Sequence, residues 1–499
     1  MRPRRKLSRS APRACEAAIE CLEERTLLTG NVLAAVVHGG NLLVLGDSKA
    51  NQIAIQSTAG GGLQISSLDG TTKINGSTNP FTANGVTGGV YIFLGQGNDV
   101  LQIGVGGATP TVSPAIPVVT TSIPQNLLVV TGNGNDTVTI ENTTIGGSAA
   151  IYGGIGTDVF TVGSPATGIP VTVGSNLLVE GGFGNSTIAV FDANITGNLT
   201  LIGNGSNDHI QVGYDEGLGI IGDESETGHV NVGGNLTITD SPNSFGFLFG
   251  GLGCFATIAE SCDPSSIGFA GCYTFTGGCN FDWIFCSLLN CGLGNCGSGG
   301  EHVAVADADV TGNLSINTGC GSDEILVGAA HTPATDSNPL VNLVFGPVYV
   351  GGNLNIKSGA GNDTILLVEV SVAENTELDS GAGNDDIGVL DSSSFTGDFT
   401  IHAGRGNDSI VLSTDSFAMN VTIYGGKGTD TVGLADSLFQ GTVTINGGPG
   451  NNTFLTTQVP FANDFAGGAP VLNSVENSSE VSATDFVAAF PWISALLGV

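Results

Sequence analysis

Aspartates that end short glycine-rich loops are the residues of this 499-residue chain best suited to chemistry. The loop reads Gly-x-Gly-(Asn/Thr/Ser)-Asp, and after Gly359 it recurs every 22 or 23 residues. Ca²⁺ is a hard ion that takes roughly 6–8 oxygen ligands with flexible geometry, and carboxylates and turn carbonyls supply such oxygens. The candidate metal ligands are the loop acids Asp99, Asp136, Asp158, Asp208, Asp323, Asp363, Asp385, Asp408 and Asp430.

Apolar residues keep the same period as the loops. Alternating apolar residues follow each loop Asp by two and four positions, as Ile387 and Val389 do, which is typical of a strand with one buried face. A second strand, often introduced by Asn, precedes each loop, and a further apolar column ends in Phe395, Phe417 and Phe439. Five such columns predict an all-β solenoid, a parallel β-helix or β-roll of about 22 residues per coil, over residues 31–458.

Stacking the loops brings the carboxylates close together. At the strand spacing of about 4.8 Å, neighbouring carboxylates repel by about 1 kcal/mol in a water-like dielectric and by roughly 3–4 kcal/mol at an effective dielectric of about 20. A bound cation would relieve this repulsion. The alternative is that Gly, Asn and Asp are simply good turn residues and the ladder is structural. The degenerate loops that end in Ser186 and Asn452 lack the acid and are expected to bind a cation weakly or not at all.

Two segments match a known repeat at every defined position. GGIGTDVFT (Gly153–Thr161) and GGKGTDTVG (Gly425–Gly433) fit the nonapeptide Gly-Gly-x-Gly-x-Asp-x-U-x. The chain therefore resembles RTX (haemolysin-type) calcium-binding repeats over most of residues 95–452. The resemblance implies a right-handed β-roll in which the motif Asp carboxylates and loop carbonyls hold Ca²⁺ between coils. Standard rolls carry the motif on both edges, with about 18 residues per coil. Here one motif occurs per 22 residues, so only one edge is expected to bind calcium.

Composition limits the possible partners. Seven of the 12 Lys and Arg residues lie in the first 25 positions, and the formal net charge is −33. Such a polyanion repels nucleic acid and anionic membranes and favours cations, which excludes nucleic-acid binding. A hydrophobic fraction of 40% with only 11% charged residues favours a packed core over disorder. No stretch approaches the roughly 20 apolar residues of a membrane span.

The N-terminal segment, residues 1–30, is basic but lacks the uninterrupted apolar run of a standard signal peptide. ECLEERTLLTG (Glu20–Gly30) resembles the Leu-Glu-x-Arg-x-Leu-Leu motif found near the start of many large exported planctomycete proteins. The resemblance implies an export or sorting segment and an extracellular or cell-surface location. The alternative is a disordered tail.

Residues 241–300 interrupt the repeat with a cysteine-rich insertion. Its seven cysteines are an odd number, and the eighth, in the next coil's loop, is predicted to pair with one of them and complete four disulfides. The spacings contain no Cys-x-x-Cys pair, which argues against zinc, and disulfides imply an oxidising location. The candidates are Cys254, Cys262, Cys272, Cys279, Cys286, Cys291, Cys296 and Cys320.

The expected function is that of an extracellular, calcium-binding structural or adhesive solenoid. Its expected partners are calcium ions and a cell-surface or matrix polysaccharide or protein. The alternative is a polysaccharide-active parallel β-helix enzyme, similar to a lyase or hydrolase. The six histidines share no spacing and no catalytic motif occurs, so no catalytic residue is predicted. Residues 459–499 are expected to cover the open end of the solenoid, with a helix capped by Thr484 or Asp485 and interrupted near Pro491.

Overall fold

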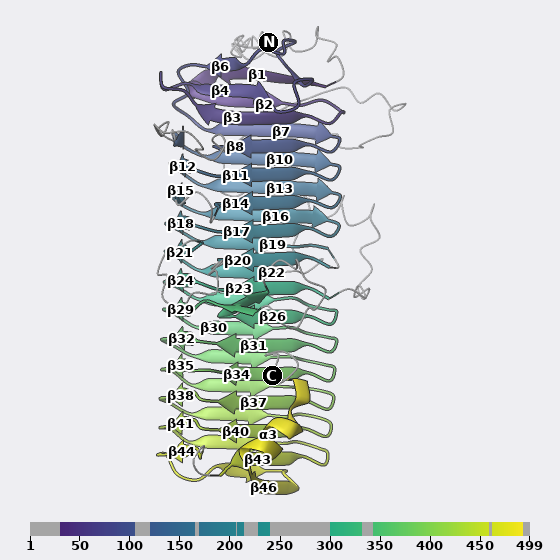
Figure 1. Cartoon of the computed structure of the whole chain (residues 1–499), viewed down its shortest axis with the longest axis vertical. Coiled ribbons are helices and arrows are strands. Elements are labelled where there is room, and N and C mark those ends of the chain that lie inside the picture. Colours follow the sequence, from purple (N-terminus) through teal and green to yellow (C-terminus); the bar gives the residue numbers. More distant parts are fainter. Residues whose placement is uncertain are drawn as a thin grey trace, which may run out of the picture.

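The computed structural model describes residues 30–104, 120–164, 169–205, 207–213, 228–239, 300–331, 343–458 and 462–492. These residues form a parallel β-helix, an elongated rod with three sheets running along its axis (Figure 1). The all-β, parallel solenoid expected from the sequence is therefore confirmed. The N-terminal segment and nearly all of the cysteine-rich insertion lie outside the described residues.

Each coil contributes one strand to each sheet. In one coil, β15 (Val171–Val173) lies in sheet 3, β16 (Leu177–Phe183) in sheet 1 and β17 (Thr187–Val190) in sheet 2. The glycine-rich loop joins sheet 1 to sheet 2, and the chain then enters sheet 3 of the next coil. Successive coils pair in parallel, as Leu354↔Thr376 shows.

The remaining strands of the coils follow the same order. Sheet 1 also holds β2 (Asn41–Leu45), β7 (Val90–Gln96), β10 (Leu127–Asn133), β13 (Ala149–Ile155), β19 (Leu199–Ile202), β22 (Leu236–Thr239), β25 (Leu314–Asn317), β30 (Leu354–Lys357), β33 (Thr376–Asp379), β36 (Phe399–His402), β39 (Val421–Tyr424), β42 (Val443–Asn446) and β45 (Val471–Asn473). Sheet 2 also holds β3 (Gln52–Ser57), β8 (Val100–Ile103), β11 (Thr137–Ile140), β14 (Val159–Val162), β20 (His209–Val212), β23 (His302–Val305), β26 (Glu324–Val327), β31 (Thr364–Val368), β34 (Asp386–Leu390), β37 (Ser409–Ser413), β40 (Thr431–Ala435), β43 (Thr453–Thr457) and β46 (Asn477–Val481). Sheet 3 also holds β9 (Thr121–Ile123), β12 (Thr143–Ile145), β18 (Ala193–Ile195), β21 (Val230–Val232), β24 (Ala308–Val310), β29 (Val348–Val350), β32 (Val370–Val372), β35 (Ser394–Phe395), β38 (Ser416–Phe417), β41 (Leu438–Phe439) and β44 (Asp464–Phe465).

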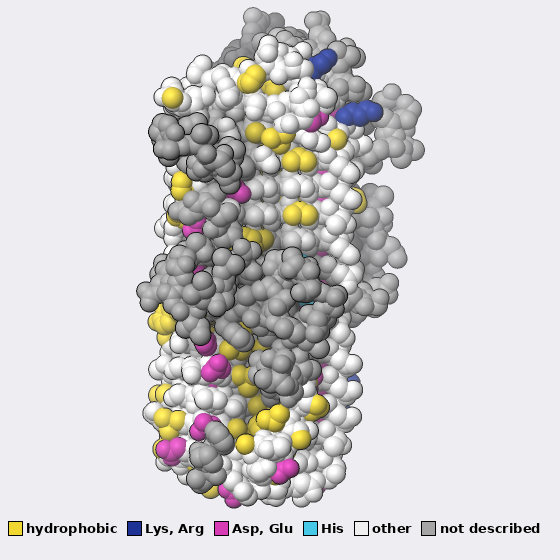
Figure 2. All heavy atoms as spheres, in the orientation of Figure 1, with side chains coloured by type: hydrophobic (Ala, Val, Ile, Leu, Met, Phe, Trp, Pro, Cys, Tyr) yellow, Lys and Arg dark blue, Asp and Glu magenta, His cyan; other side chains and the backbone are white. Residues whose placement is uncertain are grey.

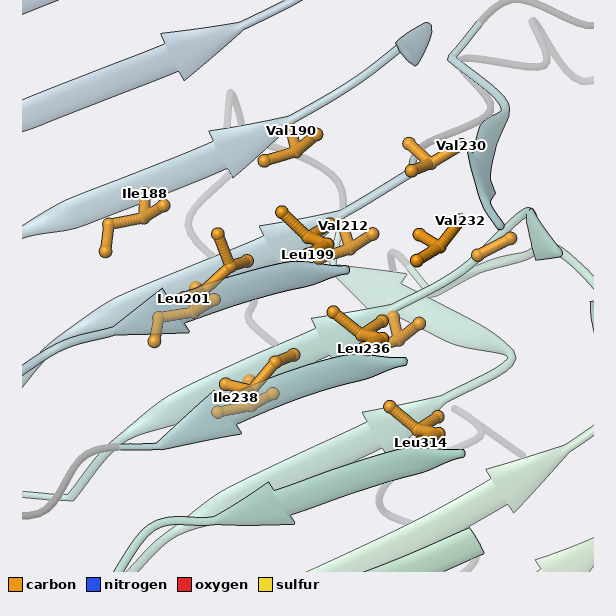
Figure 3. Packing of buried hydrophobic residues seen from close by; sticks show 14 of the residues in the cluster. Ile188, Val190, Leu199, Leu201, Val212, Val230, Val232, Leu236, Ile238 and Leu314 are labelled. Atoms are coloured by element: carbon orange, nitrogen blue, oxygen red, sulfur yellow. The ribbon is translucent and has the colours of Figure 1, made fainter. Parts of the chain in front are cut away.

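Equivalent apolar side chains stack along the axis and form the core. Leu199, Leu236 and Leu314 occupy the same position on successive strands of sheet 1 and are fully buried (Figure 3). At the C-terminal end the column expected from the sequence becomes a stack of phenylalanine rings. The Phe417 and Phe439 ring centroids lie 5.0 Å apart at an interplanar angle of 2°. The parallel register brings identical residues together, so one column pattern builds the whole core.

The corner between sheet 3 and sheet 1 is held by side-chain amides. Before most sheet-1 strands, a side-chain oxygen accepts the backbone N–H of the equivalent residue in the next coil. Asn198 N–H donates to Asn176 Oδ1 at 2.8 Å, and Asn353 N–H donates to Asn313 Oδ1 at 2.7 Å. This contact explains why Asn so often precedes these strands. At the turn, the backbone N–H has no carbonyl acceptor in the neighbouring strand, and the Asn side-chain oxygen accepts its hydrogen bond instead.

Antiparallel strands close the N-terminal end, which the periodicity did not predict. β1 (Asn31–Val37) pairs antiparallel with β2, and β4 (Leu63–Ser67) pairs antiparallel with β3 and with β6 (Phe81–Ala83). The short strand β5 (Lys73–Ile74) and the 3₁₀ turn η1 (His38–Gly40) complete this region. Elsewhere, β27 (Ala329–His331) and β28 (Leu343–Phe345) form a hairpin beside sheet 2. The antiparallel strands thus give β2 and β3, the first strands of the parallel ladders, a partner on both sides.

The C-terminal segment differs from the expected cap. The strands β44, β45 and β46 continue the coil beyond residue 458. The helix α3 (Ala483–Ala489) then packs on the flank of the rod over sheet 2, in front of β40 and β43 (Figure 1). Its N-cap is Ser482, and not Thr484 or Asp485 as predicted, because the Ser482 hydroxyl accepts the N–H of Asp485. It lies there because an outward-facing apolar stripe of sheet 2, including Leu366 and Val411, offers burial to Phe486 and Phe490.

Candidate functional site

The glycine-rich loops stack because their glycines allow close backbone contact. Gly404 and Gly406 have φ values of 98° and 139°, a region that favours glycine. A Cβ on Gly406 would overlap the carbonyl oxygen of Gly383 in the preceding coil. The Gly-x-Gly pattern therefore allows successive loops to pack closely, and this packing places each loop Asp next to the equivalent residue of the adjacent coil.

All nine predicted Asp residues lie in one buried ladder. Each is at most 2% exposed, and each Oδ1 accepts the N–H at the equivalent position of the preceding coil, for example Asp385 N–H to Asp408 Oδ1 at 3.0 Å. On the face that Figure 2 shows, acidic side chains are scattered spots and form no continuous stripe. The donor and acceptor pairs are Asn51–Asp99, Asp99–Asp136, Asp136–Asp158, Ser186–Asp208, Glu301–Asp323, Asp323–Asp363, Asp363–Asp385, Asp385–Asp408 and Asp408–Asp430.

The ladder extends beyond the predicted residues. Asp430 N–H donates to Asn452 Oδ1 at 3.0 Å, and Asn452 N–H donates to Glu476 Oε2 at 2.7 Å. Glu301 occupies the position in the coil that follows the insertion, and the apolar pair Val303 and Val305 two and four residues later could have revealed it. Because Asn452 serves in place of an acid, this hydrogen bond needs an acceptor oxygen and not a charge.

The second carboxylate oxygen faces the interior of the loop. Thr318 Oγ1 donates to Asp323 Oδ2 at 2.6 Å. Hydroxyls also lie beside Asp363 and Asp385: Ser358 Oγ donates to the Ser380 carbonyl and Ser380 Oγ to the Ala403 carbonyl, while each hydroxyl also lowers the pKa of the neighbouring carboxyl. Within the described chain, the buried Oδ2 atoms of Asp363 and Asp385 have no hydrogen-bond donor. If such a carboxyl were protonated, it could donate a hydrogen bond to the neighbouring serine oxygen, because a hydroxyl that donates to a carbonyl can still accept.

Burial shifts the ionisation of the ladder. Desolvation raises the pKa of Asp99 and Asp408 to about 7 and that of Asp158, Asp363 and Asp385 to about 6, although the backbone hydrogen bond to each carboxylate opposes the shift. The neighbouring Asp carboxylates add to the rise for Asp99 and Asp408. Part of the ladder is therefore protonated at mildly acidic pH.

The oxygens that calcium would need are largely in use. The carbonyls of Gly381 and of Arg405 accept the N–H groups of Arg405 and of Gly383 at 2.9 and 2.7 Å, and this pattern repeats along the loops. One oxygen of each ladder carboxylate is also taken, while calcium takes roughly 6–8 oxygens. In the part of the chain that the structure describes, no three His, Cys, Asp or Glu side chains could hold one metal ion. The hydrogen-bonded ladder thus fits an inter-coil calcium ion poorly, and calcium binding stays a prediction from the sequence.

Comparison with known proteins adds no assignment. No family model, curated protein or solved structure matches this chain. Over the described residues, no helix has the length and apolar character needed to cross a membrane.

We predict that acidification stabilises the protein. The folded-state pKa values of about 6 and 7 lie above the unfolded Asp value of about 3.9. Between about pH 4 and 7 the folded ladder therefore holds more protons than the unfolded chain, and the free energy of unfolding falls as the pH rises through this window. In EDTA, the melting temperature should be higher at pH 5 than at pH 8. An unchanged or lower value at pH 5 would contradict the raised pKa values.

We further predict that the ladder tolerates Asp408→Asn but not Asp408→Ala. The Asn variant keeps an acceptor for Asp385 N–H, so at pH 8 its melting temperature should equal or exceed that of the unchanged protein. The Ala variant leaves that N–H buried without an acceptor and should lose about 1–3 kcal/mol of unfolding free energy. Arg405→Ala, at an exposed position of the same loop, is the control and should change stability by at most about 0.5 kcal/mol. Equal losses in Asp408→Asn and Asp408→Ala would show that the ladder needs the carboxylate itself.

Proposed function

We propose that this chain is an exported structural or adhesive rod of the cell surface, and that the hydrogen-bonded corners stabilise it without a metal ion. One observation carries the proposal: three sheets continue from coil to coil through the described residues (Figure 1). Such a rod gains stability from nearest-neighbour stacking and suits a spacer or surface role. The proposed coil of about 22 residues is supported by the 22-residue offset between Asp363 and Asp385.

The test is the shape, metal dependence and location of the full chain. In EDTA, X-ray scattering should give a rod roughly 60 Å or more in length, on a strand spacing of about 4.8 Å. Circular dichroism should show a β spectrum that millimolar Ca²⁺ does not change, and antibody should label intact source cells. A chain that is unfolded in EDTA and folds on adding Ca²⁺ would support the RTX-like alternative. Label accessible only after cell lysis would overturn the surface location.

We also propose that Cys320 ties the cysteine-rich insertion to the rod. The chain leaves the described coil after β22, whose last residue, Thr239, pairs with Asn317 in β25. Cys320 lies three residues beyond Asn317, in the adjacent loop. The register therefore brings Cys320 next to the point where the insertion departs, while the insertion's seven cysteines lie outside the described residues.

We predict that the eight cysteines from Cys254 to Cys320 resist alkylation in the exported protein. Iodoacetamide applied under denaturing, non-reducing conditions should label none of them, because all are expected to be paired in an oxidising location. Reduction before alkylation is the control and should label all eight. A peptide containing Cys320 that is alkylated without reduction would contradict the proposed link.

A further inference from the structure

Four outward-facing side chains on sheet 3 form a row across consecutive coils. Asn194 pairs in register with Asn231, Asn231 with Asp309, and Asp309 with Tyr349. They belong to β18, β21, β24 and β29, so neighbouring members of the row are about 4.8 Å apart. A shallow groove of about 350 Å³ runs along the row, and Thr196 and Thr311 also line it.

A histidine beside the row fixes the polar side chains. His229 Nδ1 lies 2.7 Å from Asp307 Oδ1, and His229 Nε2 lies 3.3 Å from Asn231 Oδ1 and 3.6 Å from Asp309 Oδ2. The hydrogen bond to Asp307 raises the pKa of His229 to about 9, although burial opposes the shift. The ring is therefore protonated at neutral pH and donates from both nitrogens.

The direction of the next hydrogen bond follows from this protonation. Asn231 Oδ1 accepts from His229, so the Asn231 amide group donates, and its Nδ2 lies 2.9 Å from Asn194 Oδ1. Because Asn194 is used as an acceptor, its own amide group remains as a donor in the groove that it lines. A row of solvated polar residues would need no such ordered network.

The groove combines these polar groups with an exposed aromatic ring. Tyr349 is 49% exposed, and the Asp309 side chain beside it is 58% exposed. Tyrosine offers a rigid apolar surface at low entropic cost, while a carboxylate accepts hydrogen bonds and an amide donates them. Sugar rings present an apolar face and hydroxyls that both donate and accept, so they complement all three groups. A neutral ligand also avoids repulsion by a chain with a net charge of −33.

We propose that this groove is a binding site for a neutral polysaccharide segment. A sugar ring lies against Tyr349, and its hydroxyls bond to Asp309 and to the amide groups of Asn231 and Asn194. His229 is a positioning residue that holds Asn231 and Asp309 in place. The inference adds a ligand to the proposed surface rod, and its failure would leave the scattering and EDTA results for the rod unchanged.

The test measures binding of the full chain to immobilised hexasaccharides of glucose, mannose, galactose and xylose in EDTA. Polygalacturonate, a negatively charged polysaccharide, is tested under the same conditions for comparison. We expect binding of at least one neutral hexasaccharide and weaker binding of polygalacturonate. Tyr349→Ala and Asp309→Ala should each weaken that binding about tenfold or more, which corresponds to about 1.4 kcal/mol. Both side chains are exposed, so neither change should alter the melting temperature by more than a few degrees.

Tyr424→Ala is the matched control. Tyr424 is also exposed, at 39%, but lies on sheet 1 beside His402. This variant should bind the hexasaccharide as the unchanged protein does. The proposal is overturned if no neutral hexasaccharide binds at millimolar concentration, if binding requires added Ca²⁺, or if Tyr424→Ala weakens binding as much as Tyr349→Ala. Preferential binding of polygalacturonate would also overturn it.

Discussion

The fold depends on side-chain oxygens that cap the backbone amides at its corners. In a parallel β-helix, the backbone N–H and C=O groups of neighbouring strands hydrogen-bond to one another. A tight corner, however, leaves N–H groups that no backbone carbonyl of the adjacent coil reaches. Asn oxygens fill this role between sheets 3 and 1, and Asp oxygens fill it between sheets 1 and 2. At the third corner Ser393 N–H donates to Asp415 Oδ1 at 3.0 Å. Side chains therefore link coils at all three corners, although at the third corner other coils use backbone acceptors, as where Ala193 N–H donates to the His229 carbonyl at 3.1 Å.

Capping explains both the loop composition and its electrostatic cost. The loop glycines allow the approach that brings Asp408 Oδ1 to the amide of Asp385, and the same approach removes the carboxylate from water. Removing a charge from water is unfavourable, so the pKa of Asp408 rises to about 7. A neutral amide at Asn452 makes the equivalent bond. Either a metal ion or a proton could neutralise the buried carboxylate. Because the ladder oxygens already accept backbone hydrogen bonds, these contacts favour a proton.

The surface of the rod has a different character from its corners. The outward positions of the strands are free to vary, because only inward positions and corner residues are constrained by stacking. Sheet 2 uses this freedom to receive α3 through Phe486 and Phe490. Sheet 3 uses it to place Asn231, Asp309 and Tyr349 side by side. A regular scaffold of this kind can thus carry separate surface features without changes to its core.

The sequence by itself determined the all-β class, the stacked columns and the positions of the nine ladder acids. It could do so because the parallel register turns a constant spacing into direct contact, so Phe417 and Phe439 stack and Asp363 lies next to Asp385. Only the tertiary structure decided which oxygen of each Asp caps an amide and that the other is buried. It also decided that Glu301 joins the ladder and that His229 meets Asp307, 78 residues away. These contacts cross insertions of irregular length or depend on side-chain direction, which a residue period does not encode.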